Sequence, residues 1–214
     1  MLAPGTPERP IVFVVDDDVS VRDSLALLVR SARWRCETFE SAQSFLERTQ
    51  PDVPSCLLLD LSMPDVDGLE LQERLVIRYP HLPIIFVSGL ADVPKTVQAM
   101  KAGAVEFLTK PLAHDKLIAA ITAALERSRA ALARDARTDT LRGRYASLSP
   151  REREVMLLVV AGLLNKQVGG ELGISLPTVK AHRGSVMRKM NARSVPELVN
   201  MCAALGIGPE PRRR

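Results

Sequence analysis

The stretch Ile11–Asp18, IVFVVDDD, decides the fold of the first half of this 214-residue chain. Five apolar residues, rich in Val and Ile, run directly into three aspartates, which predicts a strand buried on both faces. Adjacent ionised carboxylates raise each other's pKa and cost free energy. The dipole of a following helix favours one or two of them, above all Asp18. The alternative that explains all three is a bound cation.

Four further strand-like runs follow, separated by amphipathic stretches of helical length. The strands are expected at 35–39, 56–59, 84–87 and 105–108, and the helices at 19–32, 41–48, 68–78, 93–102 and from 113 onward. Five such repeats predict an α/β fold with a parallel five-stranded sheet and helices on both faces. Ligands of these sheets bind at the carboxyl ends of the strands.

The residues at these carboxyl ends carry the chemistry. Asp16 and Asp17 end the first strand, Asp60 the third, Ser88 the fourth and Lys110 the fifth. Three carboxylates, a hydroxyl and an ammonium should therefore meet at one edge of the sheet. Carboxylate oxygens suit Mg²⁺, and the ion makes adjacent carboxylates tolerable. A carboxylate flanked by cations and a hydroxyl is also suited to accept a phosphoryl group.

The motifs VVDDD, LLLDLSMPDVDG, VSG and AMKAGAVEFLTKP resemble, in order and spacing, the receiver domain of two-component response regulators. The resemblance covers residues 11–127 and is strongest to the FixJ branch. It implies a flavodoxin-like (βα)5 fold with Asp60 as phospho-acceptor. It also implies Mg²⁺ held directly by Asp17, Asp60 and the Ser62 backbone carbonyl, with Asp16 acting through water.

The resemblance assigns further residues to the phosphoryl group. Lys110 would pair with it and Ser88 would shift toward it. Phe107 stands at the position of the family's switch aromatic, although packing explains an aromatic residue equally well. The Lys110–Pro111 bond is often cis in relatives. Leu90 departs from FixJ-like sequences, which often have His there, and this affects any expectation for the phosphoryl lifetime.

Charge divides the chain in two. Residues 1–140 hold 16 Lys and Arg against 20 Asp and Glu, net −4, whereas residues 141–214 hold 13 against 5, net +8. The basic part is a candidate for binding nucleic acid, with a merely soluble basic surface as the alternative. We expect disorder at 1–10 and 209–214, a helical extension and linker at 128–147 with a polar hinge over 138–147, and a DNA-binding domain at 148–208.

Residues 148–208 resemble the LuxR-type helix-turn-helix domain. Ser149 and Glu152 form a capping box before a helix, and Asn165 starts a short helix that ends at Leu172. Ser175 caps a recognition helix over 176–190. We expect helix breaks at Gly162, Gly173, Asn191 and Gly206. Gly169 and Gly170 lie inside the short helix, where each costs about 1 kcal/mol of helix stability.

The recognition helix has an apolar stripe and a basic face. Val179, Val186 and Met190 should be core. The expected DNA contacts are Lys180, Arg183 and Arg188 to phosphates or base edges, Thr178 and Lys166 to the backbone, and Ala181 and Gly184 as small residues that permit close approach. His182 is interpreted as a packing residue, with a place in the groove as the alternative.

These features predict a phosphorylation-dependent transcription regulator rather than an enzyme. A sensor histidine kinase would phosphorylate Asp60, and a homodimer, formed through the helix at 93–102 and the strand at 105–108 by resemblance, would bind promoter DNA near RNA polymerase. No apolar run reaches membrane-spanning length and three scattered cysteines suggest a reducing cytoplasm. The alternatives are a phosphohydrolase, which usually has Asp where Ser62 stands, and a DNA-binding protein independent of phosphorylation.

Overall fold

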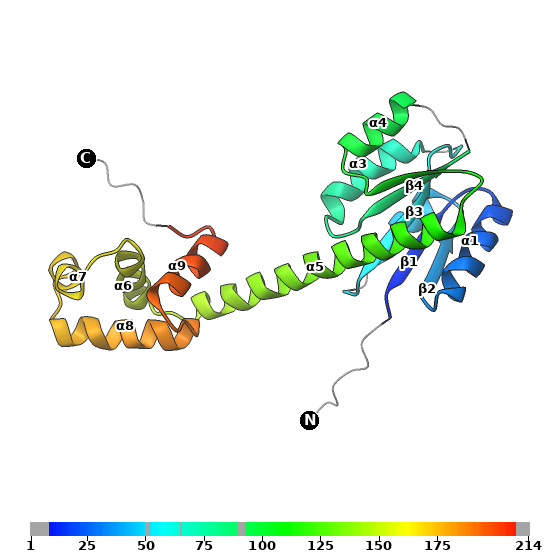
Figure 1. Cartoon of the computed structure of the whole chain (residues 1–214). Helices are drawn as coiled ribbons and strands as arrows, with labels where there is room; N and C mark the ends of the chain where they lie inside the picture. Colours follow the sequence, from blue (N-terminus) through cyan, green and yellow to red (C-terminus); the bar gives the residue numbers. More distant parts are fainter. Residues whose placement is uncertain (1–8, 50–51, 65, 90–92, 209–214) are drawn as a thin grey trace. The chain divides into compact units, whose positions relative to one another are not determined.

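The computed structural model of the chain describes residues 9–49, 52–64, 66–89 and 93–208 (Figure 1). The chain divides into two compact units at residues 133 and 134. Most of the two segments expected to be disordered, residues 1–8 and 209–214, lies outside the described residues, as does Leu90. In the described part of the chain, no helix is both long enough and apolar enough to cross a membrane.

The first unit contains a five-stranded parallel sheet in the order β2-β1-β3-β4-β5. The strands are β1 Ile11–Val15, β2 Arg35–Phe39, β3 Ser55–Asp60, β4 Ile84–Ser88 and β5 Glu106–Thr109. Val12 of β1 pairs with Cys36 on one side and with Cys56 on the other. The strand order reverses at β1 and β3, where such sheets bind their ligands. The predicted fold class is confirmed.

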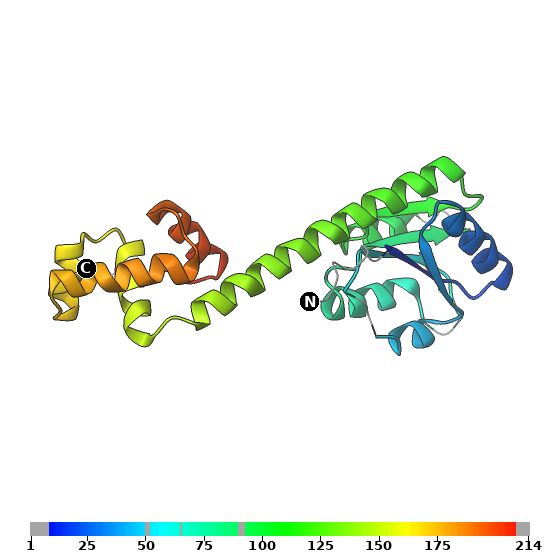
Figure 2. The same cartoon turned by 90° about the horizontal axis from the view of Figure 1, so that it is seen from below.

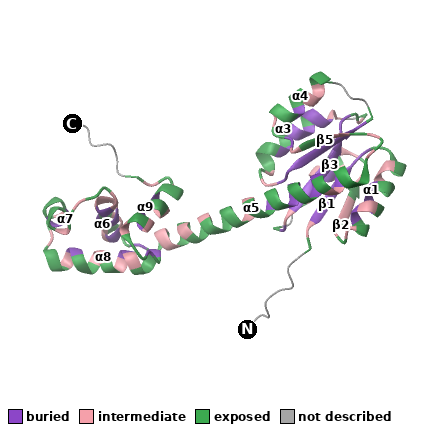
Figure 3. Ribbon diagram, in the orientation of Figure 1, coloured by how far each residue is buried: buried purple, intermediate pink, exposed green. Residues whose placement is uncertain are grey.

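Side-chain alternation along β1 divides the core between the two sheet faces. Ile11, Phe13 and Val15 pack with α2 Ala42–Leu46, α3 Gly68–Arg78 and α4 Val93–Lys101, whereas Val12 and Val14 pack with α1 Val19–Ser31 and α5 His114–Ala146. Figures 1 and 2 show α1 and α5 on one face of the sheet, and Figure 3 shows the central strands β1, β3 and β4 as its most buried part. Burial on both faces explains the unbroken apolar runs.

The carboxyl end of β3 meets the start of α3 at very short range. Asp67 caps α3, with its Oδ1 accepting from the backbone N–H of Leu69 at 3.0 Å. At Gly68, a Cβ atom would lie 2.6 Å from the carbonyl oxygen of Asp60 and 3.1 Å from the Cα of Leu61. Only glycine permits this approach. The first turn of α3 therefore packs directly against the backbone of Asp60, the predicted phospho-acceptor.

The predicted hinge at 138–147 is wrong, because α5 continues without a break to Ala146. Local hydrogen bonds support its second half: the Thr138 hydroxyl donates to the Arg134 carbonyl, and Arg142 pairs with Asp139. Tyr145 then packs into the core of the second unit. Polar composition indicated an exposed segment, but exposure is compatible with a helix that is anchored at its end.

The second unit is helical, with α6 Pro150–Val160, α7 Asn165–Leu172, α8 Leu176–Met190 and α9 Val195–Ala204. The capping box of Ser149 and Glu152 and the Ser175 cap are confirmed. All four predicted helix breaks have positive φ, namely Gly162, Gly173, Asn191 and Gly206. Left-handed residues satisfy the last carbonyls of a helix, so they mark its end in the sequence.

Candidate functional site

Lys110 joins two carboxylates at the carboxyl edge of the sheet. Its Nζ donates to Asp16 Oδ2 at 2.8 Å and to Asp60 Oδ1 at 2.9 Å. Both aspartates are buried, with 2% and 6% of their surface exposed. These three residues come from the ends of β1, β3 and β5, so the sheet brings them together as predicted.

Backbone groups fix the orientation of each member of this cluster. The Asp18 N–H donates to Asp16 Oδ1 at 2.9 Å, and the Ser62 N–H donates to Asp60 Oδ2 at 2.7 Å. The Lys110 N–H donates to the Ser88 carbonyl at 2.8 Å, which places the lysine across from β4. The peptide bond from Lys110 to Pro111 is cis.

The two carboxylate partners of Lys110 favour its charged form. Partial burial lowers its pKa, but the hydrogen bonds and charges of Asp16 and Asp60 raise that pKa by more, so it lies above the ordinary lysine value. The ammonium is therefore charged at neutral pH. It offsets the repulsion between the two buried carboxylates.

Asp17 differs from its neighbours. It is exposed, and its carboxylate has no hydrogen-bond or ionic partner among the described residues. Oxygen donors on Asp16, Asp17 and Asp60 suit Mg²⁺ chemistry. As they stand, the described His, Cys, Asp and Glu side chains form no group of three or more arranged as a metal site. Of Asp16, Asp17 and Asp60, only Asp17 has no partner among the described residues and can turn toward an ion.

The two predicted switch residues lie on β4 and β5. Ser88 ends β4 with 1% of its surface exposed, in register with Thr109. Phe107 is half-buried and stacks on Phe86, with ring centroids 6.1 Å apart. Phe107 therefore packs at the margin of the core, and this arrangement is compatible with both readings of the residue.

Two contacts near the acidic edge were not predicted. Arg22 Nη1 donates to the Asp16 carbonyl oxygen at 2.7 Å. Lys95 of α4 pairs with Asp67 Oδ2 at 3.0 Å, and the cap to Leu69 and this lysine hold the pKa of Asp67 below its ordinary value although burial raises it. An aspartate directly before a helix is a sequence signal for the Asp67 cap, but nothing in the sequence identifies the partners of the two long cations.

The predicted DNA face of α8 is exposed, and its apolar stripe is buried. Val179, Val186 and Met190 have at most 1% of their surface exposed. The exposed residues include Lys180, Ala181, Gly184 and Arg188. A Cβ atom at Gly184 would have no neighbour within 4 Å apart from the adjoining backbone of α8, so this face is open at its centre. The arrangement suits close approach to a major groove.

The other predicted DNA contacts have partners inside the domain or lie beside α8. Arg183 is half-buried and donates to Asn165 Oδ1 at 2.7 Å, which ties α8 to the start of α7. The hydroxyl of Thr178 lies 2.7 Å from that of Ser175. Lys166 is exposed, and His182 is half-buried. Arg183 therefore has a structural contact as well as its predicted contact with DNA.

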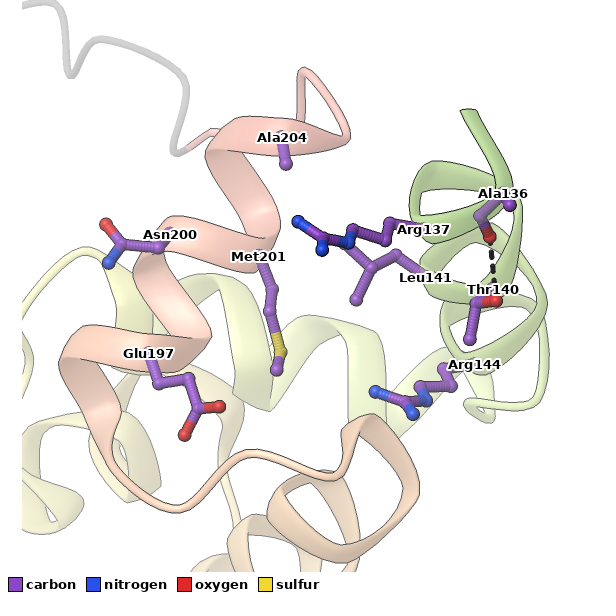
Figure 4. A pocket seen from close by; sticks show the side chains of 9 residues that line it. All are labelled: Ala136, Arg137, Thr140, Leu141, Arg144, Glu197, Asn200, Met201 and Ala204. Carbon is purple, nitrogen blue, oxygen red and sulfur yellow. Dashed lines mark hydrogen bonds between the residues drawn. The ribbon is translucent and has the colours of Figure 1, made fainter. Parts of the chain in front are cut away.

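A groove of about 550 Å³ lies between the end of α5 and α9 (Figure 4). It is lined from α5 by Ala136, Arg137, Thr140, Leu141 and Arg144, and from α9 by Glu197, Asn200, Met201 and Ala204. Leu141 and Met201 point toward each other across it. Met201 is half-buried and also packs against the core of the second unit.

Comparison with known proteins covers both units. Residues 12–122 match the response regulator receiver domain, and residues 146–202 match the luxR family of bacterial regulatory proteins. The chain is 48% identical to nodulation protein W of Bradyrhizobium diazoefficiens, over 93% of this chain and 88% of that protein. It is 44% identical to the transcriptional regulatory protein FixJ of Rhizobium meliloti, over 92% and 97%.

Comparison with solved structures also finds response regulators. The response regulator StyR matches with a TM-score of 0.80 and 46% identity, over 91% of this chain and 98% of that chain. Full-length FixJ from B. japonicum matches with a TM-score of 0.54 and 40% identity, over 94% and 98%. The chain belongs to the response regulator family and is a transcription regulator that joins a receiver domain to a LuxR-type DNA-binding domain.

Proposed function

We propose that Asp60 accepts a phosphoryl group from a sensor histidine kinase. The observation that carries the proposal is the shared ammonium of Lys110, which binds the buried carboxylates of both Asp16 and Asp60. A cation within 3 Å of the acceptor stabilises charge that develops on the phosphoryl oxygens. Ser88, buried one strand away, supplies a hydroxyl that shifts toward the phosphoryl group.

Receiver domains typically bind Mg²⁺ at their acidic edge, and the donor set here fits that ion. Asp17 and Asp60 would hold it directly together with the Ser62 backbone carbonyl, and Asp16 would act through water. When bound, Mg²⁺ neutralises the phosphoryl oxygens during transfer. Transcription regulators of this family are in general not enzymes, and the only turnover we propose is slow loss of the phosphoryl group from Asp60 to water.

The output is DNA binding by a homodimer. Val93, Val97 and Met100 are exposed along α4 with 70%, 46% and 42% of their surface accessible, and this apolar face supports pairing through α4 and β5. Phosphorylation would change this face through Ser88 and Phe107, pair two α8 helices on promoter DNA and bring them near RNA polymerase. Three free cysteines support a place in the reducing cytoplasm.

The test is intact-protein mass after incubation with acetyl phosphate and Mg²⁺. Wild type should gain one phosphoryl group, and Asp60→Asn should gain none, because the amide cannot form an acyl phosphate. Chromatography with light scattering should then show a dimer only for the phosphorylated protein. A phosphoryl gain in Asp60→Asn, or none in either protein, would contradict the assignment of Asp60.

DNA binding by the same samples separates the remaining alternatives. Phosphorylated wild type should bind promoter DNA more tightly than Asp60→Asn. Equal affinity for both would favour a DNA-binding protein that is independent of phosphorylation. Free phosphate released over many turnovers would instead favour a phosphohydrolase.

A further inference from the structure

Arg22 lies in the first turns of α1 and reaches back over the loop that carries the three aspartates. Its Nη1 donates to the carbonyl oxygen of Asp16 at 2.7 Å in a partly buried position. This carbonyl belongs to the peptide group that joins Asp16 to Asp17. Arg22 therefore holds the peptide plane from which the Asp17 side chain projects.

The side chains on either side of Asp17 have restraints of their own. The Asp16 carboxylate is bound by Lys110 and by the Asp18 N–H. The Asp18 carboxylate caps α1 by accepting from the backbone N–H of Ser20 at 2.8 Å. Asp17 alone has no such contact among the described residues. The position from which its carboxylate can reach an ion is therefore set by the backbone, and Arg22 holds the carbonyl group of the preceding residue.

We infer that Arg22 is a positioning residue for Asp17 as a Mg²⁺ ligand and prepares the metal site before the ion binds. The inference rests on the proposed function, which places Mg²⁺ on Asp17 and Asp60. Two effects of Arg22 oppose each other. Its charge repels the ion, whereas its charge-assisted hydrogen bond orients the ligand. Salt screens the first effect and leaves the second, so the two can be separated.

The experiment is calorimetric titration of the unphosphorylated full-length chain with MgCl₂, at low salt and at about 1 M salt, where the screening length is about 3 Å. Arg22→Met should raise the Kd for Mg²⁺ about tenfold at high salt, as is usual when a group that orients a metal ligand is lost. At low salt the rise should be smaller, because the lost charge repulsion offsets part of it. Arg22→Lys keeps the charge without the planar donor fork and should raise the Kd by a smaller factor.

Arg30→Met is the matched control, because it removes the same charge from an exposed position on the same helix. It should leave the Kd within about twofold at high salt, since only long-range charge is changed. Thermal unfolding without Mg²⁺ checks that each variant is folded. If Arg22→Met does not fold, Arg22→Lys carries the test.

Two results would overturn the inference. One is a Kd for Arg22→Met that equals the wild-type value at both salt concentrations. The other is a Kd for Arg22→Met that lies below the wild-type value at low salt and equals it at high salt. That result would mean that Arg22 acts on the ion only through charge repulsion. Failure of the proposed metal site is distinguishable, because then wild type and Asp17→Asn would bind Mg²⁺ equally or not at all.

Discussion

Gln72 is a polar side chain in the apolar layer between α3 and α4. It is 1% exposed, and its Nε2 donates to the Ala99 carbonyl at 3.0 Å, while its Oε1 has no partner in the described structure. The Ala99 carbonyl also accepts from the Ala104 N–H at 3.1 Å. A buried amide oxygen without a donor costs free energy, whereas the carbonyl would remain satisfied without Gln72.

Replacing Gln72 with leucine should therefore stabilise the first unit by about 1 kcal/mol, because an unpaired oxygen is removed from the core. Urea unfolding followed by the fluorescence of Trp34, the only tryptophan, reports on this unit. The midpoint should rise with an unchanged m-value. Gln72→Glu is the control, since it buries a charge and should destabilise. A lower midpoint for the leucine variant would contradict this account.

Glu152 makes the second unit sensitive to acid. Hydrogen bonds from Lys189, Ser185 and the Ser149 backbone lower its pKa from 4.5 to about 2, although burial acts in the opposite direction. A carboxylate with a lowered pKa in the folded state contributes stability that is fully present above pH 4.5 and is lost as the pH falls toward 2.

Glu152→Gln should thus destabilise the second unit at pH 7 by about 2 kcal/mol, because hydrogen bonds to a charged acceptor are lost. The difference from wild type should shrink as the pH falls below 4.5. Calorimetric unfolding between pH 7 and 3 measures it, with Glu154→Gln, an exposed acid on the same helix, as control. A difference independent of pH would mean that the charge of Glu152 is unimportant.

Individual site residues could be predicted from the sequence where the topology of the sheet alone brings their side chains together. Asp16, Asp60 and Lys110 end parallel strands, so the sheet must bring them to one edge. It failed for Arg22 and Lys95, because a long cation can reach several acceptors and only the folded backbone decides which one it binds.

At the scale of elements, the helices of the second unit begin and end almost where local signals predict. Ser175 and the left-handed Asn191 bound α8, and both act within one turn of chain. The end of α5 was not predictable in this way, because Tyr145 is anchored by residues distant in sequence. Local caps are visible in a sequence, whereas tertiary anchoring is not.

The two glycines inside α7 have different consequences. At Gly169 a Cβ atom would lie 2.9 Å from the carbonyl oxygen of Ile174, whereas at Gly170 it would have no neighbour within 4 Å apart from the adjoining backbone of α7. The sequence alone assigned both the same cost. The structure shows that Gly169 permits a close turn between α7 and α8, and that Gly170 serves no packing contact.

Gly170→Ala should stabilise the second unit by about 1 kcal/mol through helix propensity. Gly169→Ala, its neighbour in the same helix, should show no such gain, because the backbone of Ile174 must shift. Thermal unfolding monitored by circular dichroism compares the two variants. Equal stabilisation by both substitutions would show that the contact at Gly169 relaxes without cost.

For the whole molecule, the boundary between units falls inside α5. Arg153 places its guanidinium 4.9 Å from the centre of the Tyr145 ring and donates to the Ala146 carbonyl at 3.1 Å, and Arg144 donates to the Met190 carbonyl at 3.3 Å. The last turns of α5 therefore belong to the DNA-binding unit, which the sequence placed at 148–208.

A fragment of residues 134–208 should be more stable than one of residues 148–208 by about 2 kcal/mol, somewhat less than the loss of a fully buried aromatic side chain, because Tyr145 is only partly buried. Urea unfolding of the two fragments measures the difference. Tyr145→Ala in the longer fragment is the control and should account for most of it. Equal stability of the two fragments would place the boundary at Leu148.

The contact between Gly68 and the Asp60 carbonyl has a mechanical consequence. With no side chain between them, the last peptide of β3 and the first turn of α3 touch directly, and there is no compressible layer to absorb a displacement. A displacement of the backbone at residue 60 should therefore move the start of α3 by a similar distance. A saturation library at position 68 should accordingly return glycine alone.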